Sequence, residues 1–110
     1  MKKILAYKDG YTSLYESLNQ NEKDKVDRVM ILMQSYDRIP AHYIRFLRDG
    51  IFELRISIRN KELRFLFIYD GEDVVILLNC FVKKTRKTPK GEIEKAIRLK
   101  KEYEESKTNE

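Results

Sequence analysis

The hydrophobic pattern of this chain changes its period once, at Pro40, and that change limits the possible folds more than any other feature. Before Pro40, apolar side chains recur every three or four residues, which is typical of one face of a helix. These side chains are Tyr11, Leu14, Tyr15 and Leu18, then Val26, Val29, Met30, Met33 and Tyr36. We expect two helices that pair as a hairpin, with Asn21 as the N-cap of the second. A short strand over residues 3–8 precedes them.

After Pro40, apolar and polar side chains alternate, which is the period of a strand with one buried face. The alternation covers residues 52–69, and a weaker strand is expected over residues 43–48. Residues 74–82 are apolar at nearly every position, as in a strand covered on both faces. Tight turns are indicated by Asp49-Gly50 and Asp70-Gly71, with a further turn at Asn60. Strands joined in this way form an antiparallel meander.

A last helix is expected to begin near Thr88 and Pro89, with Thr88 as its N-cap and Pro89 at the first helical position. Its buried side would carry Ile93, Ala96, Ile97 and Tyr103. The predicted fold class is therefore α+β, with an N-terminal strand and helical hairpin packed on a twisted antiparallel meander and a C-terminal helix. A chain of 110 residues has the size of one domain, which we place at residues 1–110.

The rare residue types exclude several protein classes. A single cysteine, Cys80, cannot form a disulfide framework, and with a single histidine, His42, a zinc site within the chain is nearly excluded. No apolar run approaches the roughly 18 residues that a membrane span needs. We therefore expect a cytoplasmic protein that uses no cofactor and no metal. Cys80 is expected to be a buried small hydrophobe, and His42 either a general acid or an exposed or structural side chain.

Positive charge is concentrated near the end of the meander. The net charge is +5, and residues 83–90 contain five basic side chains and no acidic one. Such a cluster is typical of a phosphate-binding surface, although a solvated loop has the same composition.

A second group of charges falls on one side of the predicted sheet. Glu53 and Arg55 are two residues apart, so both leave the same side of one strand, and Arg64 lies on the neighbouring strand. The next strand ends at Lys83 and Lys84. We expect these cations to converge on a hollow that suits a phosphate, above all the extra charge of a phosphoryl transition state. The alternative is a set of cross-strand ion pairs on an ordinary surface.

Three segments carry a family resemblance: Phe46–Arg55, Arg64–Phe67 and Leu77–Pro89, followed by Glu92, Ile93 and Ala96. Together they resemble the HigB-like, phage-derived branch of the RelE/ParE toxin superfamily. The resemblance implies a RelE-like fold and the toxin of a type II toxin–antitoxin system. RelE-like members cut mRNA on the ribosome, without a metal, by attack of a 2′-hydroxyl on the adjacent phosphate. This activity would be that of an endoribonuclease that blocks translation.

The resemblance also implies roles for individual residues. Arg64 matches a transition-state stabiliser, and Lys84 sits where RelE carries an arginine that assists the leaving group. Arg55 occupies the place of a lysine linked to activation of the 2′-hydroxyl, and Glu53 replaces a second lysine. Because a guanidinium does not readily lose its proton, Glu53 or a Lys83 with a lowered pKa would act as the base. Apart from the resemblance, the positive charges of Arg45, Arg48, Arg86 and Lys87 make them candidate RNA-backbone contacts, with solvated surface charge as the equal alternative.

Partners and alternatives follow from the same resemblance. The implied partners are mRNA, the ribosome and a cognate antitoxin, expected to carry a helix-turn-helix domain, with no membrane involved. ParE-like relatives share the fold but bind DNA gyrase, so a non-nuclease toxin is one alternative. A basic nucleic-acid-binding module without catalysis is another.

Overall fold

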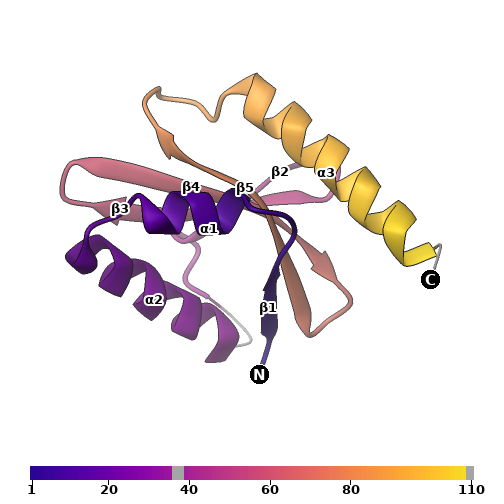
Figure 1. The fold of residues 1–110 in the computed structure, drawn as a ribbon, viewed down its shortest axis with the longest axis horizontal. Coiled ribbons are helices and arrows are strands. Elements are labelled where there is room, and N and C mark those ends of the chain that lie inside the picture. Colours follow the sequence, from indigo (N-terminus) through magenta and orange to yellow (C-terminus); the bar gives the residue numbers. More distant parts are fainter. Residues whose placement is uncertain (36–38, 109–110) are drawn as a thin grey trace.

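The computed structural model describes residues 1–35 and 39–108, and in these residues a single mixed sheet is flanked by helices (Figure 1). The sheet has the strand order β1-β5-β4-β3-β2. Its strands are β1 (Lys3–Ala6), β2 (Ile44–Arg48), β3 (Ile51–Ile58), β4 (Lys61–Asp70) and β5 (Val74–Lys83). The helices are α1 (Gly10–Glu16), α2 (Gln20–Ser35) and α3 (Lys90–Thr108).

The predicted α+β class and the antiparallel meander are confirmed. Strands β2 to β5 pair antiparallel in chain order, whereas β1 pairs in parallel with β5 and makes the sheet mixed. The turn between β2 and β3 has the positive φ angles that its sequence predicts, 52° at Asp49 and 79° at Gly50. Tyr36, which the helical pattern includes, lies outside the described residues.

The two faces of the sheet carry separate hydrophobic cores. Helices α1 and α2 cover one face, where Val26 and Met33 pack against the strand residues Leu54, Phe65 and Phe67. Helix α3 covers part of the opposite face, with Ala96 buried among side chains that include Ile51, Leu66, Ile76 and Leu78. The helices therefore explain why β5 is apolar on both sides. The rest of the second face stays uncovered by helix and carries the charged residues.

Two helix starts differ from the sequence prediction. The N-cap of α2 is Asn19, not Asn21, because the Glu22 backbone N–H donates to Asn19 Oδ1 at 2.9 Å while Asn19 N–H donates to the Glu22 carboxylate, also at 2.9 Å. This reciprocal pair is a capping box. At the start of α3 the Pro89 carbonyl accepts the first helical hydrogen bonds, from Glu92 and Ile93. The side chain of Thr88, predicted to cap α3, bonds to Glu53 instead.

An irregularity in β5 connects α1 and α3 to the sheet. Phe65 pairs with Cys80 and Phe67 with Leu77, so β5 contains one extra residue at this point, as in a β-bulge. Asn79, within the bulge, donates through Nδ2 to the main-chain oxygen and carboxylate of Glu92 in α3, both at 2.9 Å. On the other side, a Cβ on Gly10 would lie 2.8 Å from the main-chain oxygen of Leu78, so this close approach of α1 requires glycine. Among the described helices, none has the length and apolar character that a bilayer span needs.

Candidate functional site

Glu53 is the centre of the charged group on the uncovered face. Its side chain is buried, with only 1% of the residue exposed, in the middle of β3. Oε1 lies 3.7 Å from Arg64 Nε and 4.0 Å from Arg55 Nε, and Oε2 accepts a hydrogen bond from the Thr88 hydroxyl. A buried carboxylate needs such partners, since an isolated buried charge is costly. Glu53 therefore holds two strands and the loop before α3 together.

Arg55 and Arg64 lie directly opposite each other across β3 and β4. Like charges in this register repel, and here Glu53, two residues along β3, contacts both. The two arginines differ in access. Arg55 has 41% of its side chain exposed, whereas the side chain of Arg64 is 3% exposed. Arg55 is thus the arginine that a ligand on this face can touch.

The guanidinium of Arg64 is held from several sides beneath this surface. Nη1 donates to the Leu63 carbonyl at 2.9 Å, and Nη2 donates to Glu62 Oε1 at 3.3 Å. Its Nε is buried, and within the described residues it has no hydrogen-bond acceptor, because Glu53 lies slightly too far away. Arg64 thus contributes positive potential and orients two carboxylates.

Lys83 extends the cluster from the last residue of β5. Its pKa is lowered, first by partial burial and then by the nearby Arg64, while Glu53 acts in the opposite direction and Arg55 and Arg45 lower it further. In the sheet, Lys83 pairs with Glu62, which lies two residues from Arg64 on the same side of β4, so Lys83 lies beside the same charges. A lysine with a lowered pKa supplies a larger share of neutral amine near neutral pH, which a proton acceptor requires.

Of the residues predicted to act in catalysis, the structure brings together Glu53, Arg55, Arg64 and Lys83. Lys84 follows the end of β5 and is exposed. It lies beyond the last strand residue, so the strand alternation that places Lys83 in the cluster does not determine the direction of Lys84.

Three of the four predicted RNA-backbone contacts line a pocket of about 320 Å³ beside this cluster: Arg45, Arg48 and Lys87. Thr88, which bonds to Glu53, lines the same pocket. Arg86 is exposed in the loop and is not part of the lining. The pocket therefore continues the positive surface from the Glu53 cluster toward the edge strand β2.

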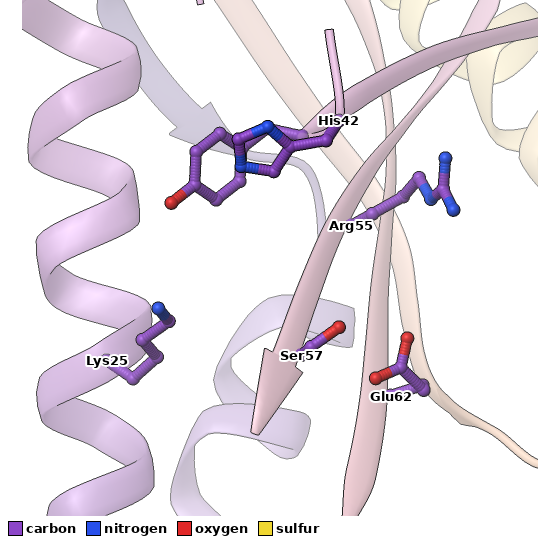
Figure 2. A pocket seen from close by; sticks show the side chains of 6 residues that line it. Lys25, His42, Arg55, Ser57 and Glu62 are labelled. Atoms are coloured by element: carbon purple, nitrogen blue, oxygen red, sulfur yellow. The ribbon is translucent and has the colours of Figure 1, made fainter. Parts of the chain in front are cut away.

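A second pocket, of about 270 Å³, adjoins the cluster on its other side (Figure 2). We name it the His42 pocket; it is lined by Lys25, His42, Tyr43, Arg55, Ser57 and Glu62. Sequence spacing did not indicate this group, because Lys25 comes from α2 and His42 from the segment before β2. Beyond Arg55, which the sequence already placed in the site, strand alternation could have indicated Ser57 and Glu62, since they share the polar side of the strands with Arg55 and Arg64.

The single cysteine and the side chains that could bind a metal ion are two further candidates for a reactive site. Cys80 is partly buried, and burial strongly raises the pKa of its thiol, which favours the unreactive protonated form. Its surroundings agree with the expected role of a small hydrophobe. Within residues 1–35 and 39–108, no three side chains of the types His, Cys, Asp and Glu come close enough together to bind a metal ion.

Comparisons with known proteins give one family and a distant structural neighbour. A solved structure similar to this chain is that of a conserved hypothetical protein, HP0894, from Helicobacter pylori, at 12% identity and a TM-score of 0.49, covering 74% of this chain and 94% of that one. No curated protein matches the chain. The family described as phage derived protein Gp49-like (DUF891) matches residues 15–101. Because this match spans most of the sequence, the chain belongs to the Gp49-like family of phage-derived proteins, which is a RelE/HigB-type toxin family.

Proposed function

We propose that this protein is the toxin of a type II toxin–antitoxin system and that it cleaves mRNA on the ribosome. The family supports a toxin module. The observation that supports a nuclease is that Arg55 and Arg64 both lie within 4.0 Å of a single buried carboxylate, Glu53, and that Lys83 lies beside them at the end of β5. A protein whose only task is to bind another protein has no need for converging cations, whereas a phosphate that gains charge in its transition state does.

The proposed reaction is transesterification within the RNA strand. The 2′-hydroxyl oxygen forms a bond to the adjacent phosphorus, the bond from phosphorus to the 5′-oxygen breaks, and a 2′,3′-cyclic phosphate and a 5′-hydroxyl result. Lys83 in its neutral form takes the proton of the 2′-hydroxyl, and exposed Lys84 returns a proton to the 5′-oxygen. Arg55 contacts the non-bridging oxygens, where charge accumulates.

Burial supports a different division of labour between Glu53 and Arg64 from the one that sequence suggested. Glu53 is 1% exposed and engaged by three neighbours, so a substrate hydroxyl cannot approach it; we assign it to positioning, and the base to Lys83. Arg64 is equally inaccessible, so we assign it to stabilising the site electrostatically and holding Glu53 in place. On the adjoining surface, Arg45, Arg48 and Lys87 would bind the flanking RNA backbone.

The decisive experiment is induced expression of the toxin alone, followed by growth and by sequencing of cleaved RNA ends in translating extracts. We expect the wild type to stop growth and cut ribosome-bound mRNA, and Arg55→Ala and Arg64→Ala to lose both effects. Arg28→Ala, on the exposed side of α2, is the matched control. Circular dichroism checks that each variant folds.

Other outcomes distinguish the competing functions. Growth arrest with inhibited DNA supercoiling and intact mRNA would identify a gyrase-directed toxin. Full toxicity of the folded Arg55→Ala variant would remove this site from consideration.

The family implies an antitoxin, and we propose that it covers the positive surface formed by the Glu53 cluster and the neighbouring pocket. Acidic or helical segments suit that surface, and a helix-turn-helix domain on the antitoxin would fit the expected type. Co-expression with the neighbouring gene should yield a stable complex and restore growth. Failure of every neighbouring product to do so would contradict this part of the proposal.

A further inference from the structure

The His42 pocket lies beside the proposed scissile site and offers the chemistry of a nucleobase site. A pocket of about 270 Å³ is just below the range of small-molecule sites, roughly 300–1,000 Å³, and has room for one planar base. In Figure 2, Lys25 reaches toward it from α2, the His42 ring lies at its upper side, and Ser57 and Glu62 lie at the opposite end.

The upper side of this pocket supplies a stacking surface. The rings of His42 and Tyr43 lie with their centroids 4.2 Å apart and their planes 38° from each other, and His42 is exposed. An exposed ring that already rests on a second ring is a rigid platform. Unpaired RNA bases are held in this way by aromatic side chains, including histidine.

The opposite end supplies hydrogen-bond acceptors. A hydrogen bond from the Ser57 side chain, reinforced by Arg64, lowers the pKa of Glu62, so its carboxylate is ionised at neutral pH. An ionised carboxylate only accepts hydrogen bonds, and it therefore favours bases that carry an exocyclic amino group. Cytosine has such a group where uracil has a carbonyl oxygen, which a carboxylate repels.

The pocket and the Glu53 cluster share residues. Arg55 lines the pocket and also lies 4.0 Å from Glu53, and Glu62 accepts from the buried Arg64 at 3.3 Å. A nucleotide with its phosphate at Arg55 can therefore extend its base into the pocket. On the basis of the proposed function, we propose that the His42 pocket binds the base next to the scissile linkage, by stacking on His42, and that Glu62 selects an amino-bearing base over uracil.

Binding of nucleoside 3′-monophosphates, which present no scissile linkage, tests the pocket separately from cleavage. We expect the wild type to bind cytidine 3′-monophosphate roughly tenfold more tightly than the uridine compound, the discrimination of one good base contact. Glu62→Gln, which keeps an oxygen for Arg64 but adds an amide donor, should abolish this preference. Glu72→Gln, in the exposed turn after β4, should preserve it.

Stacking is tested at His42. His42→Ala should weaken the binding of both nucleotides about tenfold or more without changing the ratio of their affinities. His42→Phe should restore binding, because stacking requires an aromatic ring and does not depend on a ring nitrogen. Failure of phenylalanine to restore binding would overturn the stacking role.

Cleavage-site sequencing completes the test. Uracil should be depleted next to the cut for the wild type and accepted by Glu62→Gln. Equal binding of the two nucleotides, or an unchanged preference in Glu62→Gln, would contradict the proposed base site without contradicting the proposed nuclease activity. Selective nucleotide binding by a protein that cuts no RNA would support the proposed base site and contradict the proposed nuclease activity.

Discussion

The buried pair of Glu53 and Arg64 should be energetically coupled, and a double-mutant cycle measures that coupling. The variants are Glu53→Gln, Arg64→Met and their combination, each of which removes charge while keeping most of the side-chain volume. Either single variant leaves one buried charge with only its remaining partner, Glu62 for Arg64 or Arg55 for Glu53, whereas the double variant leaves neither buried charge. The double variant should therefore be more stable than the two single losses predict.

The magnitude follows from the geometry. At the 3.7 Å between Glu53 Oε1 and Arg64 Nε, two unit charges attract by about 4.5 kcal/mol at an effective dielectric constant of about 20. Desolvation offsets part of this attraction, and Glu62 still neutralises Arg64 in part when Glu53 is changed. We therefore expect each single variant to lose about 3 kcal/mol and the coupling free energy to be about 2–3 kcal/mol. A chain of this size has a total stability of roughly 5–15 kcal/mol, so the single variants should stay folded and their free energies of unfolding can be measured.

Urea unfolding followed by far-ultraviolet circular dichroism gives the free energy of unfolding for the four proteins. Parallel slopes against urea are required, because a changed slope signals a changed denatured state. Strictly additive losses, with a coupling below about 0.5 kcal/mol, would show that the two side chains do not interact. The account of Glu53 as the centre of the site would then be wrong.

Three further predictions concern other parts of the molecule. Gly10→Ala should cost about 1–2 kcal/mol in urea unfolding, since its Cβ would lie 2.8 Å from the main-chain oxygen of Leu78, whereas Gly91→Ala, with nothing within 4 Å, should cost nothing. The single-turnover rate of RNA cleavage should rise as pH rises through a Lys83 pKa below the ordinary 10.5, and Lys83→Arg should lack this rise; a wild-type rate independent of pH would exclude Lys83 as the base. Hydrogen bonds from Lys107 and Tyr103 lower the pKa of Asp70 in the folded protein. The contribution of Asp70 to stability should therefore be complete above its ordinary pKa of 3.8 and disappear as the pH falls through the lower folded-state pKa. Asp70→Asn should flatten this acid dependence of the urea midpoint.

The local sequence was sufficient to predict the strands and most of the turns. The alternation in β3 and β4 assigns Glu53, Arg55 and Arg64 to one side of the sheet, and the observed register places the two arginines opposite each other as the hairpin requires. Asp49-Gly50 predicted its own turn, because the positive φ angles depend on those two residues. The residues at which the helices begin were harder to predict from the sequence. Asn19 and Asn21 are chemically equivalent caps, and the glutamate three residues after Asn19, which exchanges hydrogen bonds with it, distinguishes them.

The sequence by itself determined which charged side chains share a face, since a strand turns alternate residues to opposite sides whatever surrounds it. Only the tertiary structure decided which of these charges meet solvent. In the folded chain Arg55 is exposed, whereas Arg64 is buried and bonded to Leu63 and Glu62, which no strand periodicity could reveal. The fold alone also placed Lys25, from α2 on the opposite face, and His42 in one pocket with Arg55, because proximity depends on segments that are distant in the chain.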